Sequence, residues 1–217
     1  RKINVSQVTV GADLKVSSTI KNLVDGGIVK FTADQTAALN LDVNIFEAYA
    51  GTANVLNLVL SDDAATGNGI DAGTVTAAGV ETININSDDT AANPAGTVAH
   101  TLVLTAADAT SVVVTGDTKI TVTAAASSTK IATFDASTAK ADVIFTAVSA
   151  NNVTITGGAG NDTLTGSTLN DTIIGGAGDD ELTGTAQAND TITGGKGIDT
   201  ITYTGGKDTF TGGEGAD

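Results

Sequence analysis

Short runs in which apolar and polar residues alternate dominate the first three quarters of the chain. Ile83 and Ile85 lie on one face of an extended segment, and Leu102 and Leu104 do the same further along. Alternation with a period of two is typical of a β-strand that has one face in a core and the other in water. The pattern predicts strands, rich in β-branched residues, at 55–60, 81–86, 100–105, 111–115, 119–123 and 142–146.

Turns and spacing indicate how these strands are arranged. Polar and small residues at 62–69 and 88–96 mark loops, and residues 34–50 carry enough helical signal for only one or two turns. The spacing between strands is uneven, which fits an irregular parallel β-solenoid (β-helix), with a β-sandwich as the alternative. We favour an all-β solenoid for residues 1–156, because the regular repeats that follow need a matching edge on which to stack.

A nine-residue period begins at residue 157 and runs to residue 217. Its seven repeats, the fourth with one extra residue and the last ending at its Asp, are GGAGNDTLT, GSTLNDTII, GGAGDDELT, GTAQANDTIT, GGKGIDTIT, YTGGKDTFT and GGEGAD. The sixth position is always Asp: Asp162, Asp171, Asp180, Asp190, Asp199, Asp208 and Asp217. Two positions later the residue is apolar: Leu164, Ile173, Leu182, Ile192, Ile201 and Phe210. A flexible glycine-rich linker is the alternative, but linkers do not keep Asp and apolar residues in phase.

Each residue type in the repeat suits one task. Glycine at the first, second and fourth positions permits a tight loop in which backbone carbonyls turn towards an ion. Aspartate supplies a hard oxygen ligand, and the apolar residue after it points inward from a short strand. Calcium takes about six to eight oxygens in irregular geometry, whereas magnesium demands a tighter octahedron and keeps its waters. The repeats therefore predict calcium as the bound ion.

The pattern G-G-x-G-x-D-x-U-x, where U is a large apolar residue, resembles the repeat of RTX proteins, which binds calcium in a β-roll. That resemblance implies that two nonapeptides make one turn, so that alternate repeats stack on the same side. The first, third, fifth and seventh repeats keep the glycine pattern, and the second, fourth and sixth do not. The fold predicted for residues 157–217 is therefore an RTX calcium β-roll with ions along one flank.

The predicted metal ligands all lie in the odd-numbered repeats. They are the carboxylates and loop residues Asp162, Asp180, Asp199, Asp217, Gly158, Ala159, Gly160, Asn161, Gly176, Ala177, Gly178, Asp179, Gly195, Lys196, Gly197 and Ile198. The other flank, with Asp171, Asp190 and Asp208, is expected to be mostly free of metal. Stacked strands lie about 4.8 Å apart, so ionised Asp residues in a column repel by roughly 1–3 kcal/mol per pair. Folding of the roll is therefore expected to require calcium.

A weaker candidate metal site lies upstream. Gly67, Gly69 and Asp71 match the second, fourth and sixth positions of the repeat, and Asp62 and Asp63 are close to them in the sequence. This spacing also occurs in ordinary polar turns, which are the alternative interpretation.

Composition and charge narrow the possible partners. The formal net charge is −15, which disfavours nucleic acid and an anionic membrane surface. No apolar run is long enough for direct membrane insertion, and the first residues lack the pattern of a signal peptide. The absence of cysteine excludes a disulfide framework. Because the chain does not begin with Met, we expect it to be a piece of a longer protein.

Nothing in the sequence indicates catalysis. With His100 as the single histidine, the H-E-x-x-H zinc motif is excluded, and no G-x-S-x-G motif occurs. His100 is interpreted as a solvent-exposed residue at the end of a strand. The acidic pair Asp179 and Asp180 is interpreted as part of a calcium loop rather than as a general acid and base. We therefore expect a protein that is not an enzyme.

Residues 72–86 (AGTVTAAGVETININ) and 204–217 (TGGKDTFTGGEGAD) resemble the C-terminal region of RTX-type surface-layer (S-layer) proteins of the Caulobacter type. The resemblance implies type I secretion through an uncleaved signal beyond Asp217, and self-association into a two-dimensional, calcium-dependent lattice on the cell surface. The lattice-anchoring region would lie at the other end of the full protein. The alternative is the calcium-dependent folding and secretion module of an RTX enzyme or adhesin.

Overall fold

The computed structural model describes residues 5–10, 18–32, 40–45, 53–62, 69–89, 98–186 and 188–217. In these ranges the chain forms strands and turns, and no helix. The strands that precede the repeats are β1 (Val5–Val10), β2 (Ser18–Phe31), β3 (Asn40–Ile45), β4 (Val55–Asp62), β5 (Asp71–Ala78), β6 (Thr82–Asp89), β7 (Ala99–Thr105), β8 (Ser111–Gly116), β9 (Lys119–Ala124), β10 (Thr133–Ala139), β11 (Val143–Thr146) and β12 (Thr154–Thr156). The strands within the repeats are β13 (Thr163–Thr165), β14 (Thr172–Ala177), β15 (Glu181–Thr183), β16 (Thr191–Lys196), β17 (Thr200–Thr202) and β18 (Thr209–Glu214).

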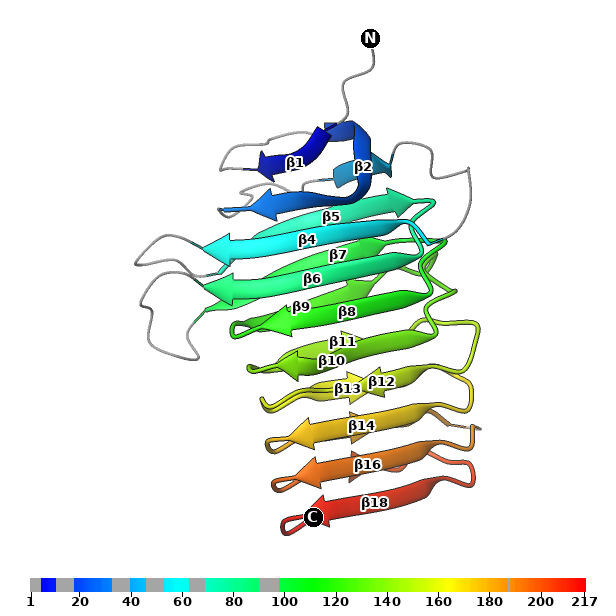
Figure 1. The fold of residues 1–217 in the computed structure, drawn as a ribbon. Coiled ribbons are helices and arrows are strands. Elements are labelled where there is room, and N and C mark those ends of the chain that lie inside the picture. Colours follow the sequence, from blue (N-terminus) through cyan, green and yellow to red (C-terminus); the bar gives the residue numbers. More distant parts are fainter. Residues whose placement is uncertain are drawn as a thin grey trace.

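These strands form two stacks in which every pairing between described strands is parallel (Figure 1). Even-numbered strands from β4 to β18 make one stack and odd-numbered strands from β3 to β17 the other, because each strand pairs with the strand two places later. Strand β2 joins the stacks, since its first part pairs with β3 and its last part with β4. The predicted parallel β-solenoid is confirmed, and the β-sandwich, which is built from antiparallel sheets, is excluded.

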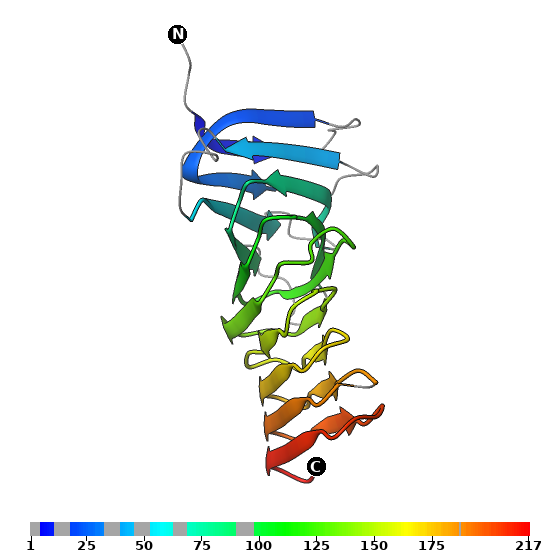
Figure 2. The same ribbon diagram turned by 90° about the vertical axis from the view of Figure 1, so that its right-hand side faces the viewer.

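The coils of the solenoid become shorter towards the C-terminal end (Figure 2). Thr82 pairs with Val55 and with Ser111, which are 27 and 29 residues away. Within the repeats, Thr172 pairs with Thr154 and with Thr191, which are 18 and 19 residues away. A coil of 18 residues is two nonapeptides, so the predicted length of the roll turn is confirmed.

The alternation pattern places six of the twelve described strands that precede the repeats. These six are confirmed as β4, β6, β7, β8, β9 and β11, with small shifts at their ends. The pattern does not predict β1, β2, β3, β5, β10 or β12, and the inward positions of β5 and β10 include the small residues Ala77 and Ala136. The expected helical turns are wrong for residues 40–45, which form β3. The remainder of that helical prediction falls mainly on residues 33–39 and 46–50, which lie outside the described residues.

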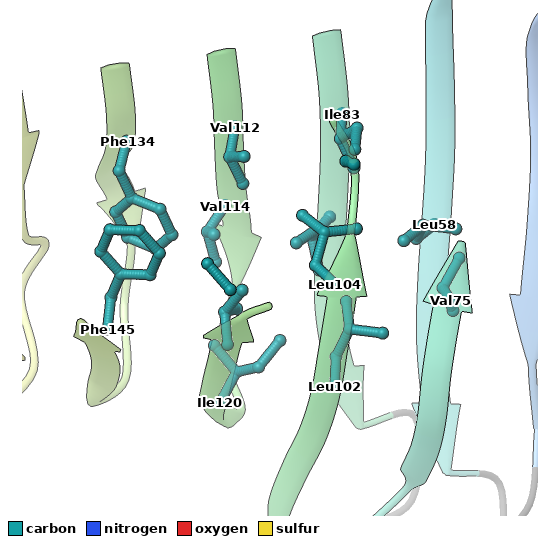
Figure 3. Packing of buried hydrophobic residues seen from close by; sticks show 14 of the residues in the cluster. Leu58, Val75, Ile83, Leu102, Leu104, Val112, Val114, Ile120, Phe134 and Phe145 are labelled. Atoms are coloured by element: carbon teal, nitrogen blue, oxygen red, sulfur yellow. The ribbon is translucent and has the colours of Figure 1, made fainter. Parts of the chain in front are cut away.

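The core is a column of apolar side chains between the two stacks (Figure 3). Phe134 of β10 and Phe145 of β11 meet across it with their rings stacked, with centroids 3.8 Å apart and planes 9° apart. The other large buried residues are mainly Leu, Ile and Val, so each coil buries only a few side chains. Such a core is stabilised by contact between successive coils rather than by one large interior.

His100 contradicts its sequence interpretation, because its side chain is fully buried. Its Nδ1 lies 3.0 Å from the hydroxyl of Ser87, which donates a hydrogen bond to the carbonyl of Thr118. The reason is the alternation of β7: His100 shares the inward face with Leu102 and Leu104, and the strand begins one residue earlier than expected.

Strand pairing continues across residue 156 without a break, because β12 pairs with β10 before it and with β14 after it. A boundary at this point between an irregular solenoid and a regular roll stays a prediction. Among the described residues, no helix has the length and apolarity needed to cross a bilayer.

Candidate metal centre along the roll

The repeats lie alternately on two flanks of the roll. The odd-repeat flank is made of residues 157–162, 175–180, 194–199 and 212–217, and the even-repeat flank of residues 166–171, 184–190 and 203–208. Leu182 pairs with Leu164 and with Ile201, and these three residues come from the first, third and fifth repeats. Alternate repeats therefore stack on the same side, as the resemblance to the RTX repeat implies.

The apolar residue of each repeat points inward, as predicted. Leu164, Ile173, Leu182 and Ile192 are fully buried. In the last turn the burial is lost, and Phe210 is 43% exposed. The aspartate side chains of the first five repeats are also buried, nearly as much as the apolar residues. The roll therefore has a carboxylate column along each flank beside its apolar column.

One oxygen of each aspartate on the odd-repeat flank holds the stack together. Asp180 Oδ1 accepts a hydrogen bond from the backbone N–H of Asp162 at 2.8 Å, and Asp199 Oδ1 accepts one from Asp180 at 3.0 Å. Asp217 Oδ1 accepts the next from Asp199 at 3.1 Å. At the start of the column, Val143 donates its N–H to Asp162 Oδ1 at 2.7 Å. Each carboxylate is thereby fixed against the turn before it.

The turns differ in whether the second oxygen of the aspartate, Oδ2, accepts a hydrogen bond. Asp162 Oδ2 accepts a hydrogen bond from the N–H of Gly158 in its own loop at 2.7 Å. Asp180 Oδ2 and Asp199 Oδ2 are buried and accept no hydrogen bond. A buried carboxylate oxygen without a partner is costly and requires a compensating charge or a proton.

Glycines leave the space that these oxygens face. A Cβ at Gly194 would lie 2.2 Å from Asp199 Oδ2 and 2.7 Å from the carbonyl oxygen of Gly212, so no other residue fits there. Gly178 has a φ of 125°, and a Cβ on it would lie 2.3 Å from the carbonyl oxygen of Gly160. The glycines therefore allow carboxylate and carbonyl oxygens of successive loops to approach one another, which is the donor set that calcium prefers.

The charge state of the column supports the same conclusion. Burial raises the pKa of Asp162 to about 6. Burial raises the pKa of Asp180 to about 7, and repulsion from Asp162, Asp199 and Asp179 adds to the effect. These carboxyl groups resist ionisation unless a cation is near. Among the described residues, no three His, Cys, Asp or Glu side chains gather closely enough to hold a metal by themselves. A cation here would thus take much of its coordination from backbone carbonyls.

On the even-repeat flank, most aspartate oxygens accept hydrogen bonds from backbone N–H groups. Asp171 accepts from the N–H of Val153 at 2.7 Å and from that of Ser167 at 2.5 Å, one on each oxygen. Asp190 likewise accepts from Asp171 at 2.8 Å and from Thr185 at 3.1 Å. These contacts are what a flank without ions requires, and the assignment of metal to the other flank stays a prediction.

Asp208, in the sixth repeat, departs from the rest of the even-repeat flank. Its Oδ2 is buried and accepts no hydrogen bond. Gly205 and Gly206 precede it with φ values of 138° and 100°, which resemble those of the odd repeats. The sixth repeat lacks glycine at its first two positions and has it at the third and fourth, whereas the positive-φ glycines of the odd repeats, such as Gly176 and Gly178, are at the second and fourth. The expectation that the even-repeat flank is mostly free of metal stays a prediction at Asp208.

A second ladder runs along the fifth position of the repeats, which sequence reasoning missed. Asn161 Oδ1 accepts the N–H of Asp179 at 2.9 Å, and Asp179 Oδ1 accepts that of Ile198 at 2.7 Å. On the other flank, Asn170 and Asn189 accept in the same way from the next turn. The signal was the Asn or Asp that directly precedes the sixth-position Asp in four of the first five repeats. These side chains tie each turn to the following one.

The upstream candidate site is only partly described. Asp71 is exposed, and its Oδ1 accepts hydrogen bonds from the N–H of Gly73 and the hydroxyl of Thr101, both at 2.9 Å. Asp62 is the last residue of β4, while Asp63 and Gly67 lie outside the described residues. Asp71 thus contacts β7 rather than a stacked aspartate, and a metal site here stays a prediction.

The difference between the two flanks leads to a prediction about single carboxylates. Asp180→Ala removes a buried oxygen that has no hydrogen-bond partner, so we expect calcium affinity to fall by roughly tenfold or more, the scale of a charge-assisted contact. Asp190→Ala removes an acceptor of two backbone N–H groups and should lower stability while leaving the number of bound ions unchanged. Calorimetric titration of both variants with calcium measures the difference. Equal loss of ions in the two variants would show that both flanks bind calcium.

Comparison with known protein families supports the repeat assignment. The RTX calcium-binding nonapeptide repeat matches in four overlapping copies, at residues 149–168, 156–189, 165–201 and 185–217. A search of curated proteins finds no significant match to the chain. The family of this repeat binds calcium. The C-terminal part of the chain is therefore a calcium-binding structural segment of RTX type, and the oxygens described above fit that ion.

Proposed function

We propose that the chain is a structural segment of a secreted surface-layer protein, in which calcium folds the roll and drives assembly of a two-dimensional lattice on the cell surface. The observation that carries the proposal is the continuous strand stacking from β2 to β18, which joins the calcium-binding roll to the solenoid in a single elongated body (Figure 1). Calcium bound at one end would stiffen that body, which is the property that a lattice unit needs.

Two further features support this function. Residues 72–86, which resemble the surface-layer family, form most of β5 and β6 in the N-terminal part of the stack. RTX repeat proteins are typically secreted by the type I route, which agrees with an extracellular location. Outside the cell calcium is abundant, whereas the low calcium of a cytosol would leave an acidic, glycine-rich segment disordered until export. In this proposal the chain associates with copies of itself and performs no catalysis.

The test is electron microscopy of the purified chain with calcium and with a chelator. Ordered sheets that form in calcium and disperse in the chelator would support the lattice function. Asp180→Ala provides a matched variant, because it should weaken calcium binding without altering the solenoid, and so should reduce sheet formation at limiting calcium. Particles that stay monomeric in calcium, although the roll has folded, would overturn the proposal.

A monomeric outcome would favour the second candidate, the folding and secretion module of an RTX enzyme or adhesin. The observation that keeps this candidate open is the match to the RTX repeat itself, which occurs in enzymes as well as in structural proteins. A catalytic motif elsewhere in the full-length protein would support it.

A further inference from the structure

The first RTX turn stacks on a coil that is held by apolar contacts rather than by ions. We call residues 133–153 the template coil; it contains β10, β11 and the loops that follow them. Phe134 and Phe145 fill its interior, and both are fully buried with stacked rings. Strand β13 of the first repeat pairs with β11, and β12 pairs with β10. The roll therefore begins on a surface whose stability does not depend on a metal.

A lysine supplies positive charge where the template coil meets the odd-repeat flank. Lys119 Nζ lies 3.1 Å from Asp142 Oδ2, and both side chains are about one third exposed. Asp142 Oδ1 accepts the N–H of Asn161, in the first repeat, at 2.9 Å. Asp142 thereby begins the fifth-position ladder, with its charge balanced by an ammonium group. At this level of the flank a fixed side chain provides the cation.

The aspartates of the first two repeats need no ion to satisfy their oxygens. Both oxygens of Asp162 accept backbone N–H groups, one from Val143 of the template coil. Both oxygens of Asp171 do the same, one from Val153 of the template coil. Asp180, in the next turn, is the first aspartate with a buried oxygen that accepts no hydrogen bond. The structural requirement for calcium thus begins at the third repeat.

We propose that residues 157–172, the first RTX turn, fold on the template coil without calcium, and that calcium then extends the roll from this turn towards Asp217. The first turn would act as a permanent starting point for ordering of the later turns. This inference depends on the calcium-binding roll and not on lattice assembly, so each can fail without the other.

Hydrogen–deuterium exchange of the whole chain, followed by mass spectrometry, tests the proposal directly. In chelator, we expect peptides from 157–172 to be protected together with those from 133–153, while peptides from 191–217 exchange rapidly. Adding calcium should protect 191–217 and change 157–172 little. If chelator exposes 157–172 as fully as 191–217, the proposal is overturned.

Asp142→Ala tests whether the contact between Asp142 and Asn161 protects the first turn in chelator. It removes the acceptor for Asn161 and the partner of Lys119, so protection of 157–165 in chelator should fall by roughly tenfold or more, the effect of losing hydrogen bonds to a charged group. Asp108→Ala is the matched control, because Asp108 also pairs with a lysine, Lys130, at 2.8 Å and accepts a backbone N–H from Gly79, far from the repeats. An unchanged first turn in Asp142→Ala, or an equal effect of Asp108→Ala, would contradict the assigned role of Asp142.

Discussion

Removal of calcium is expected to abolish most of the β structure in residues 157–217 while the preceding solenoid stays folded. The physical reason is the set of buried carboxylate oxygens at Asp180 and Asp199, which accept no hydrogen bond. Without a cation these buried oxygens lose the hydration that an open chain gives them and gain no partner in return.

Calcium binding stabilises the folded roll by mass action. An ion at about 100 times its dissociation constant stabilises the folded state by about 2.7 kcal/mol per site. Two or three such sites along one flank amount to a large share of the stability of a small segment. The loss on chelation should therefore be cooperative and reversible.

Circular dichroism in calcium and in chelator measures this effect. The strand signal should fall in chelator and return with calcium, and magnesium at equal concentration should restore much less, because it holds its waters and prefers a strict octahedron. The matched control is the chain ended before residue 157, whose signal should not respond to calcium. Identical spectra of the whole chain in calcium and in chelator would contradict the prediction.

Leu182→Asp is expected to prevent calcium-induced folding of the roll. Leu182 is fully buried in the middle of the inward ladder, where it pairs with Leu164 and Ile201. An aspartate there loses the apolar contacts, which cost about 2–5 kcal/mol when a core Leu is truncated. It also buries a carboxylate that has no hydrogen-bond partner or opposite charge, which costs several kcal/mol more. The sum approaches the whole stability of a small domain.

Thr183→Asp provides the matched control on the same strand. Thr183 is the next residue of β15 and lies on the outward face, where it pairs with Thr165 and Thr202. Substitutions on such a surface usually change stability by about 0.5 kcal/mol or less. Calcium titration followed by circular dichroism should give a normal transition for Thr183→Asp and none for Leu182→Asp. Similar transitions for both would mean that the inward face has been assigned wrongly.

Local pattern was sufficient to determine half of the described strands before the repeats and the inward face of the roll. A strand with one buried face has a period of two, so Ile83, Leu102 and Leu182 were placed inward by their neighbours alone. The resemblance to the RTX repeat, with two nonapeptides in a turn, implied which repeats stack on the same side. The aspartate column on each flank follows from that stacking.

Which carboxylate oxygens accept hydrogen bonds, in contrast, was decided only by the tertiary structure. Asp162 and Asp180 occupy the same position of nearly identical repeats, yet one has two hydrogen-bonded oxygens and the other has one. The difference lies in the loop that carries each of them, because Gly158 donates its N–H to Asp162 Oδ2 and Asp180 Oδ2 has no such partner. A repeat pattern gives the residues of a loop and not the placement of its backbone N–H groups.

Placement in three dimensions also explains what the sequence did not predict about His100, Asp142 and Asp208. Period-two reasoning was available for His100, but its polarity suggested solvent until the structure placed it between apolar neighbours. Asp142 meets the first repeat through a contact between residues 19 positions apart, which no local pattern records. Asp208 has a buried oxygen without a hydrogen bond, which its place in an even repeat did not predict. The sequence by itself therefore determined the fold class, the repeat register and the ion, because these follow from periodicity and residue chemistry. The tertiary structure decided which oxygens are left for the ion, because that depends on whether the folded loop brings a backbone N–H, such as that of Gly158, to the second carboxylate oxygen.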